Sequence, residues 1–412
     1  MKVAIIGGGV IGLGAAYELL KQGHQAVVID SAEIGSGASE GNAGWVVPSD
    51  AAPVAAPGMI LKSLKWMLHS DSPLYVKPSL NPEHVRFMLA MATHCNTKDY
   101  EQGFRLNQIL CKDSVAQFDQ YKQEGIDFEM HADGLIYAHE HEYSLEKRIH
   151  GLHLIEEFGI MGKVVSGKEM SELEPTLLPS LAGGVVYEQF RHIRPGTFVA
   201  GLLKKCLELG LEVREHEEVI DVVIDKNVKA LVTTKGRIEA DHYLIANGAH
   251  SNPLGKKFKT RIPVRPGKGY NVEFQPAPMP LKYSVNLTDA KVAVTPLNAG
   301  VRFAGTMEFA GLDRKINPAR VEAIKNSGTR YFKDWDPKNT KHTAAWAGAR
   351  PMTADGIPVI GKLPKYDNAW VSSGHGMYGI TQVKGSSELI ADLIMGKQVD
   401  KQTEVFSPKR FN

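Results

Sequence analysis

The sequence predicts an α/β fold in which a parallel sheet covered by helices is joined to a second, α+β domain with a mixed or antiparallel sheet. Residues 3–6 form a short β-branched run, typical of a strand buried on both faces of a parallel sheet. Residues 10–21 carry apolar side chains at helical spacing, and residues 25–29 form a second buried run. Between residues 261 and 306, strand-like segments alternate with Pro and Gly, which predicts the sheet of the second domain.

The bulk composition agrees with a folded protein of two domains. The chain has 412 residues, of which 43% are apolar and 23% charged, so it can bury a substantial core. Its formal net charge is +2, and the charged residues are scattered along the whole length. We therefore expect no nucleic-acid partner and a small molecule as ligand.

Cysteine usage and the lack of targeting signals favour the cytoplasm. Cys95, Cys111 and Cys206 form no C-x-x-C pair, which fits reduced thiols. The N-terminal apolar run is interrupted by glycines, so we expect neither a signal peptide nor a membrane span there. The stretch "HEHE" at residues 139–142 alternates at a strand end, which disfavours a compact ligand set, and we expect no metal site.

Gly7, Gly9 and Gly12 form a G-x-G-x-x-G motif between the first strand and the first helix. The first glycine permits a tight turn, the second lets a diphosphate approach the backbone, and the third lets helix and strand pack closely. Asp30 ends the second strand, where a carboxylate accepts hydrogen bonds from an adenosine ribose and repels the extra phosphate of NADP. Strand, helix, second strand and acid together predict a dinucleotide site with the diphosphate at the helix N-terminus.

Residues 35–45 ("GSGASEGNAGW") form a polar turn suited to backbone contact with a bulky ligand, with an ordinary surface loop as the alternative. The turn also matches the G-x-S-x-G elbow of serine hydrolases at residues 37–41. No buried strand leads straight into that match, which disfavours a hydrolase.

A second glycine turn near the C-terminus favours FAD over NAD. The segment "GHGMYG" at residues 374–379 lies between a strand at 370–373 and a helix at 381–395. The N-terminus of this helix would stabilise the negative charge of a reduced flavin. With a single nucleotide site, the electrons must leave to oxygen, a quinone or another protein.

The remaining segments predict a discontinuous nucleotide-binding domain. A helix at 198–210 and buried strands at 211–214 and 242–249 continue the N-terminal pattern, whereas residues 84–160 are mainly helical with a strand at 134–139. We assign the nucleotide-binding domain to residues 1–70, 145–175, 193–255 and 345–412. The substrate-binding domain takes residues 71–144, 176–192 and 256–344.

Residues 48–69 combine an Ala/Pro segment with apolar residues at helical spacing. Such a stripe is typical of a core or interface, and also of a helix lying on a membrane surface. Residues 53–69 are therefore a candidate for peripheral contact with the inner face of the plasma membrane.

Arg350 is the candidate for binding a substrate carboxylate, because it follows an apolar strand-like run and precedes Pro351. The planar fork of arginine binds both oxygens of a carboxylate. The alternative is a pair with a surface acid such as Asp355.

Several blocks of the chain together resemble the D-amino-acid dehydrogenases of the small-subunit type, within the D-amino-acid oxidase and glycine oxidase superfamily. These blocks are the turn at residues 7–12, "NAGWVVPSDAAPVAAPGMILKSLKWM" at 42–67, "KGY" at 268–270, "GARPMTADGIPVIG" at 348–361 and "SGHGMYGIT" at 373–381. The resemblance implies a Rossmann-like, glutathione-reductase-type domain that binds FAD noncovalently, and an antiparallel sheet roofing the site. In the superfamily the arginine of the Arg-Pro pair binds the substrate carboxylate, which carries over to Arg350.

The implied reaction is the oxidative deamination of a D-amino acid. The Cα hydrogen passes as hydride to flavin N5, water converts the imine to a 2-oxo acid and ammonia, and the electrons go to a quinone, a dye or oxygen. Orientation of the substrate then accounts for most of the catalysis.

The chain departs from its relatives in ways that leave alternatives open. Met377 stands where glycine oxidases carry an arginine, and the oxidase tyrosine near residues 291–296 is missing. Tyr270 and Tyr378 are the remaining candidates for a hydroxyl directed at the substrate. The alternatives are an amine oxidase acting on glycine, sarcosine, D-proline or hydroxyproline, and an electron-transfer protein without its own substrate.

The residues expected to contact FAD come from all of these segments. They are Gly7, Gly9, Val10, Ile11, Gly12, Asp30, Ser31, Ser36, Ser39, Asn42, Ala43, Gly44, Val219, Ala246, Gly248, Gly374, His375, Gly376, Met377, Gly379, Ile380 and Thr381.

Overall fold

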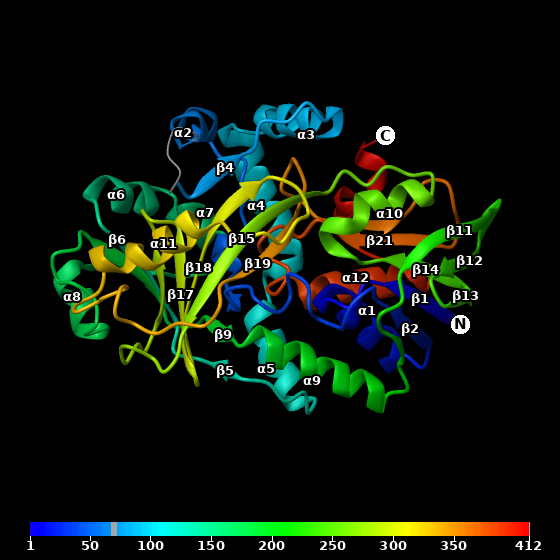
Figure 1. The fold of residues 1–412 in the computed structure, drawn as a ribbon, viewed down its shortest axis with the longest axis horizontal. Coiled ribbons are helices and arrows are strands. Elements are labelled where there is room, and N and C mark those ends of the chain that lie inside the picture. The colour runs from blue at the N-terminus through cyan, green and yellow to red at the C-terminus, as the bar shows by residue number, and fades with distance from the viewer. Residues whose placement is uncertain (67–71, 412) are drawn as a thin grey trace.

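The computed structural model describes residues 1–66 and 72–411, which form two lobes that lie side by side in Figure 1. One lobe is built on a six-stranded sheet with the order β10-β2-β1-β14-β21-β20. Its strands are β1 (Lys2–Ile6), β2 (Gln25–Ile29), β10 (Glu212–Arg214), β14 (His242–Ile245), β20 (Val359–Lys362) and β21 (Ala369–Ser373). All neighbours pair in parallel except β20, which runs antiparallel to β21. The predicted α/β fold is thus confirmed.

Layers on both faces bury this sheet, which explains its continuous apolar strands. On one face pack α1 (Val10–Lys21), α9 (Pro195–Glu208) and α12 (Val383–Ile394), with Leu13, Phe198 and Ile390 in their shared core. On the other face lie α10 (Ser251–Lys257) and a three-stranded meander. The meander consists of β11 (Val219–Asp225), β12 (Asn227–Thr233) and β13 (Gly236–Ile238).

The second lobe is built on a nine-stranded mixed sheet with the order β19-β15-β18-β17-β16-β6-β8-β7, and β4 beside β18. Most neighbours are antiparallel, but β16 with β6 and β18 with β4 are parallel. The strands are β4 (Leu74–Val76), β6 (Leu135–His139), β7 (Lys163–Ser166), β8 (Gly183–Tyr187), β15 (Arg265–Phe274), β16 (Ser284–Leu287), β17 (Val292–Leu297), β18 (Gly300–Phe309) and β19 (Trp346–Met352). Here α11 (Pro318–Ser327) packs on β15 and β18 through Val321 and Ile324.

The other elements connect the lobes or cover their edges. A small sheet is formed by β3 (Trp45–Val46), β9 (Arg191–Ile193) and β5 (Met130–His131). The remaining helices are α2 (Met59–Trp66), α3 (Pro82–Thr93), α4 (Thr97–Cys111), α5 (Ser114–Gln123), α6 (Glu142–His150), α7 (Leu152–Glu156) and α8 (Gly167–Leu173), with 3-10 turns at Pro48–Asp50, Gly248–His250, Gly328–Arg330, Lys401–Phe406 and Pro408–Phe411. No helix among the described residues combines the length and apolar character needed to cross a bilayer.

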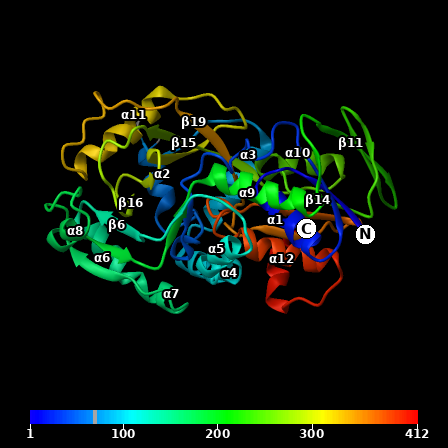
Figure 2. The ribbon, with the colours of Figure 1, turned by 90° about the horizontal axis from the view of Figure 1, so that it is seen from below.

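Three segments lie differently from the expected domain division. Strand β7, within residues 145–175, pairs with β8 of the nine-stranded sheet, and β19, within residues 345–412, pairs with β15. Conversely, α4 and α5 lie beside α12, as Figure 2 shows, and share its core through Leu110 and Phe118. The expected boundary at residue 70 lies outside the described residues.

Candidate active site

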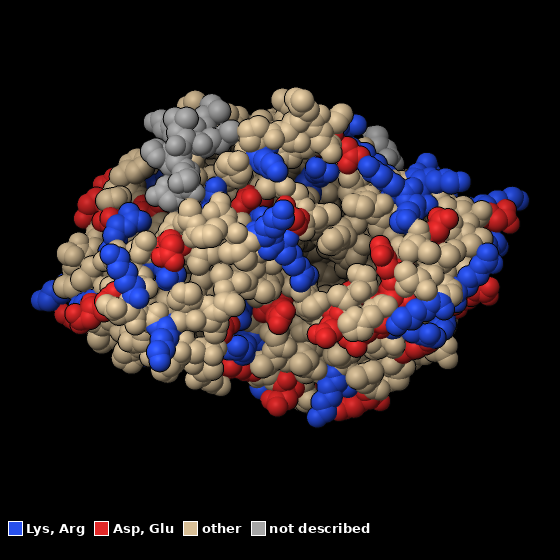
Figure 3. Space-filling view, in the orientation of Figure 1, with Lys and Arg blue, Asp and Glu red and all other residues tan. Residues whose placement is uncertain are grey.

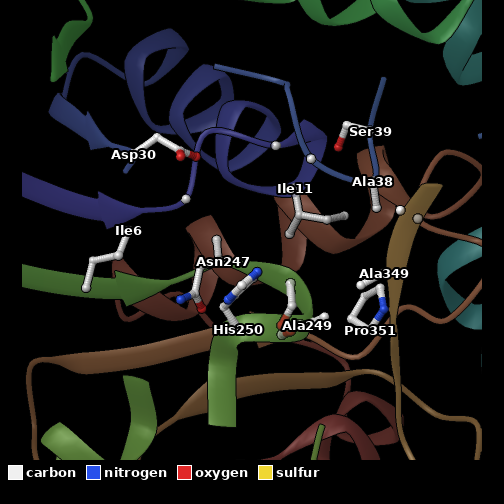
Figure 4. Close-up of a pocket in the computed structure, with 18 of the residues that line it drawn as sticks. Ile6, Ile11, Asp30, Ala38, Ser39, Asn247, Ala249, His250, Ala349 and Pro351 are labelled. Carbon is white, nitrogen blue, oxygen red and sulfur yellow. Dashed lines mark hydrogen bonds between the residues drawn. The ribbon is translucent and has the colours of Figure 1, made fainter. Parts of the chain in front are cut away.

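A cavity of about 380 Å³ opens where the two lobes meet. It lies at the carboxyl ends of β1, β2, β14 and β21, which is where open parallel sheets bind ligands. In Figure 3 this face has a central hollow, with basic side chains on one rim and acidic ones on the other. Figure 4 shows Asp30 and Ser39 on the side of α1, Asn247 and His250 facing them, and Ala349 and Pro351 on β19.

The N-terminal glycines build the turn that the motif predicts. Gly7 has φ +112°, and a Cβ there would lie 2.7 Å from the backbone of Ala246, which directly follows the neighbouring strand β14. A Cβ on Gly12 would lie 1.9 Å from the Gly7 carbonyl oxygen, so the helix can pack on the turn because position 12 has no side chain. These contacts bring the N-terminus of α1 to the cavity wall.

The first amides of α1 and the loop after β2 form a cradle suited to a diphosphate. Ser39 Oγ accepts a hydrogen bond of 3.0 Å from the backbone amide of Val10, and a Cβ on Gly9 would lie 3.0 Å from the same oxygen. Helix N-termini with approachable backbone amides bind phosphate groups. The residues present therefore fit a dinucleotide.

Asp30 directly follows β2, and two backbone amides hold its carboxylate. Its Oδ2 accepts a hydrogen bond of 2.8 Å from the amide of Gly8, and its Oδ1 accepts one of 3.0 Å from the amide of Ala32. Each carboxylate oxygen keeps further acceptor capacity. The carboxylate lines the cavity in a position suited to a ribose.

The C-terminal glycine turn faces the opposite end of the cavity. The amide of Gly376 donates a 2.8 Å hydrogen bond to the Pro351 carbonyl oxygen, which ties the turn to β19. The imidazole of His375 points to α12, where its Nε2 lies 3.0 Å from Ser386 Oγ. Burial lowers the pKa of His375 to about 3, so this imidazole is neutral at physiological pH.

Most of the residues expected to contact FAD line this cavity. They are Gly7, Gly9, Val10, Ile11, Asp30, Ser31, Ser36, Ser39, Asn42, Val219, Ala246, Gly248, His375, Gly376, Met377, Gly379 and Ile380.

The other five expected contacts, Gly12, Ala43, Gly44, Gly374 and Thr381, do not line the cavity. Gly12 packs on Gly7, and a Cβ on Gly44 would lie 2.0 Å from the Ile193 carbonyl oxygen. Thr381 Oγ accepts a hydrogen bond from the Val47 amide and donates one to the Trp45 carbonyl oxygen, both 3.2 Å long. Gly12 thus packs against a residue that lines the cavity, whereas these partners of Gly44 and Thr381 do not line it.

Arg350 lines the cavity and lies opposite Gly267 in the β15–β19 register. Its Nη1 donates a 2.8 Å hydrogen bond to the Thr306 carbonyl oxygen, and no salt bridge joins it to a carboxylate in the described part of the chain. The alternative partner, Asp355, instead pairs with Arg410 at 3.0 Å. Burial lowers the pKa of Arg350 to about 10, which is expected for a cation without an anionic neighbour.

The structure does not bring Tyr270 to this site. Its hydroxyl donates a 2.6 Å hydrogen bond to Glu308 Oε2. Side chains alternate along β15, and the adjacent Gly269 faces Arg350, so Tyr270 lies on the opposite face of the sheet.

Tyr378 is close to Arg350 but is not among the lining residues. Its hydroxyl donates a 3.0 Å hydrogen bond to the Ala52 carbonyl oxygen. Burial is the larger influence on Arg350 and lowers its pKa, whereas the electrostatic interaction with Tyr378 raises it.

Several residues that line the cavity were not predicted from the sequence. Asn247, Ala249 and His250 follow β14 as the glycine turn follows β1, so the carboxyl end of a neighbouring parallel strand could have revealed them. Leu312 and Arg314 come from the loop between β18 and α11, and no sequence signal points to them. The described residues contain no group of three or more His, Cys, Asp or Glu side chains that could hold a metal ion.

Comparisons with known proteins agree with this geometry. The family model described as "FAD dependent oxidoreductase" matches residues 2–393. A protein named D-amino acid dehydrogenase from Vibrio atlanticus is 32% identical, and the match covers 100% of both chains. Glycine oxidase from Geobacillus kaustophilus has a TM-score of 0.76 at 24% identity, over 98% of this chain and 97% of its own. L-proline dehydrogenase from P. horikoshii also has a TM-score of 0.76, at 21% identity, over 100% of this chain and 97% of its own. The chain therefore belongs to the family of FAD-dependent oxidoreductases.

Proposed function

We propose that this protein binds FAD noncovalently and oxidises D-amino acids to 2-oxo acids and ammonia. The observation that carries the proposal is Arg350, a half-buried guanidinium without a carboxylate partner among the described residues, at one end of a cavity that begins at a dinucleotide turn. A partly buried cation without an anionic partner is costly, and a substrate carboxylate would supply the missing charge. The name of the Vibrio relative supports a D-amino acid as that substrate.

The residues of the cavity divide between two tasks. The first amides of α1, Ser39 and Asp30 would hold the adenosine and diphosphate of FAD, and the turn at residues 376–380 would face its ring system. Bound there, FAD supplies the acceptor for the hydride that leaves Cα.

Arg350 would fix the substrate carboxylate and thereby orient Cα, and Tyr378 lies close enough to act on the charge of Arg350. If the substrate amine is neutral when the hydride leaves Cα, the product is an iminium ion that water hydrolyses, so the proposed reaction needs no protein base.

The electron acceptor is proposed to be a membrane quinone. Exposed apolar side chains gather on α2 and on or beside α3, namely Ile60, Leu61, Leu80, Val85 and Leu89. An exposed apolar surface of this kind suits contact with a lipid surface. Residues 67–69 of the expected membrane segment 53–69 lie outside the described residues. Flotation with liposomes tests the contact, and the replacement of Leu61 and Leu89 by Gln should abolish it.

A spectroscopic titration tests the function. The purified protein should be yellow and should release its flavin on denaturation. Under argon a D-amino acid should bleach the flavin band, and its L-enantiomer should not. Bleaching by glycine, sarcosine or L-amino acids instead would refute the proposed substrate class, and no bleaching by any amine would indicate an electron-transfer protein.

Replacement of Arg350 tests its role in that reaction. Arg350→Ala should raise KM about 100-fold, since charge-assisted hydrogen bonds to the carboxylate are lost, while the oxidised flavin spectrum stays unchanged. Arg237→Ala removes an exposed arginine on β13 and serves as the control. An unchanged KM in Arg350→Ala would contradict the assignment.

A further inference from the structure

The loop between β18 and α11 reaches from the nine-stranded sheet to the dinucleotide cavity. Its residues Leu312 and Arg314 line the cavity, together with the glycine turn and Asp30 of the other lobe. This loop is therefore the part of the substrate lobe that meets the nucleotide end of the site.

Arg314 bridges the two lobes at the mouth of the cavity. Its Nη2 donates a 3.1 Å hydrogen bond to the carbonyl oxygen of Ser36, in the loop that follows β2. The side chain is exposed, and no salt bridge joins it to a carboxylate in residues 1–66 or 72–411. A guanidinium has five N–H donors in a fixed fork, so most of them are left for a ligand.

Charges along the cavity place Arg314 near the adenosine and diphosphate region. Desolvation and the positive charge of Arg314 lower the pKa of His250, whereas Asp30 acts on the same imidazole in the opposite direction. Other cations of the lining are engaged elsewhere: Lys257 Nζ donates to the carbonyl oxygen of Ile220, and Arg350 lies at the far end. The acidic side chains Asp30, Glu217 and Glu218 also line this cavity, so a dianionic cofactor needs a compensating cation.

We propose that Arg314 binds the diphosphate of FAD across the mouth of the cavity, as a latch by which the substrate lobe retains the cofactor. The planar fork of arginine suits two phosphate oxygens, which the amides of α1 would approach from the protein side. This inference rests on the proposed FAD binding and adds a residue from the other lobe to it.

Reconstitution of the apoprotein tests the latch without any measurement of activity. FAD binding is followed by the quenching of flavin fluorescence, and ADP and riboflavin are the competing probes. Arg314→Ala should raise the Kd of FAD and of ADP by about 10- to 100-fold, mainly through a faster dissociation rate, and leave that of riboflavin unchanged. Arg314→Lys should fall between the wild type and Arg314→Ala, because it keeps the charge and loses the fork.

Lys315→Ala is the matched control, since it removes the same charge one residue further along the loop, from an exposed side chain that does not line the cavity. If Arg314→Ala and Lys315→Ala bind FAD alike, or if Arg314→Ala weakens riboflavin as much as FAD, the latch is refuted and the proposed function stands. A wild-type apoprotein that binds no FAD would refute both.

Discussion

At the scale of single residues, the place of Arg350 depends on glycines in the neighbouring strand. A Cβ on Gly269 would lie 2.1 Å from Arg350 Nη1. A Cβ on Gly267 would lie 2.5 Å from Met307 Sδ and 2.8 Å from Met352 Cγ. Strand β15 therefore leaves room for the guanidinium of Arg350 and for the thioethers beside it. Because Gly267 and Gly269 have no side chain, these groups can occupy the positions that they take in the structure.

Gly269→Ala should displace the guanidinium, because the added methyl group overlaps it. We expect KM for the amino acid to rise by at least about 10-fold, as a shift of about 1 Å in a substrate-positioning group costs up to about 100-fold. The flavin spectrum and the Kd of FAD should stay unchanged. Gly196→Ala is the control, since a Cβ there has no described atom within 4 Å beyond its chain neighbours and its own helix backbone, and φ is ordinary. Equal KM values for the two variants would show that Gly269 does not position Arg350.

Single residues were predictable where a local motif carries the chemistry. Gly7, Asp30 and Arg350 line the cavity as expected, because a turn, a strand end and an Arg-Pro pair can be recognised along the chain. Tyr270 was not predictable in this way, since the face of β15 on which it lies depends on the register with β18 and β19.

At the scale of elements, donors from the nine-stranded sheet hold the loop that carries Ser39. Asn271 Nδ2 donates to the Gly41 carbonyl oxygen, Arg302 Nη1 to that of Asn42 at 2.6 Å, and Thr295 Oγ to that of Ala43 at 2.9 Å. Three consecutive carbonyl groups of one lobe are thus fixed by the other lobe. The loop keeps its shape at the cavity because of these bonds.

Thr295→Val tests this clamp. Thr295 is buried, and its Oγ also accepts a 2.8 Å hydrogen bond from Trp45 Nε1, so the nearly isosteric valine leaves two partly buried polar groups without this partner. The free energy of unfolding should fall by about 1–3 kcal/mol, and hydrogen exchange of residues 40–46 should accelerate. Thr288→Val is the control, because among the described residues that hydroxyl makes one hydrogen bond, which is long at 3.4 Å. Unchanged exchange in residues 40–46 would contradict the clamp.

Helices and strands were predicted well where the periodicity of apolar residues is strong. The strands with which each strand pairs were not. The first helix and the second strand have the expected bounds, Val10–Lys21 and Gln25–Ile29. The sheet to which β7 and β19 belong depends on pairing between residues far apart in sequence, and strand periodicity carries no information about it. The helix expected at 381–395 begins at Val383, since Thr381 bonds to the segment around β3.

At the scale of the whole molecule, buried histidines in separate parts of the fold make stability depend on pH. His139 lies in β6, His192 in β9 and His375 in the C-terminal glycine turn, and all are buried. Burial lowers the pKa of His139 to about 4. Burial and then the neighbouring His131 lower the pKa of His192 to about 3, close to the value for His375.

The sign of the pH effect follows from the protons bound by each state. An unfolded histidine takes up a proton below a pKa of about 6.5, whereas these folded ones stay neutral down to their lowered values. The contribution of these histidines to the free energy of unfolding is therefore complete above about pH 6.5. It is lost as the pH falls, by up to about 1.4 kcal/mol per pH unit for each histidine.

His192→Gln should reduce this loss, because it removes one of the buried titrating groups. Between pH 6.5 and 4.5 the wild type should lose about 2–3 kcal/mol more unfolding free energy than the variant, measured by urea denaturation at both pH values. Comparing the pH dependence, rather than stability at a single pH, separates the proton effect from any change in packing. His141→Asn alters an exposed histidine at the start of α6 and should keep the wild-type dependence. Equal losses of stability in His192→Gln and the wild type on acidification would contradict this prediction. His192 would then be protonated in the folded protein, so its surroundings would tolerate a charge that burial is expected to exclude.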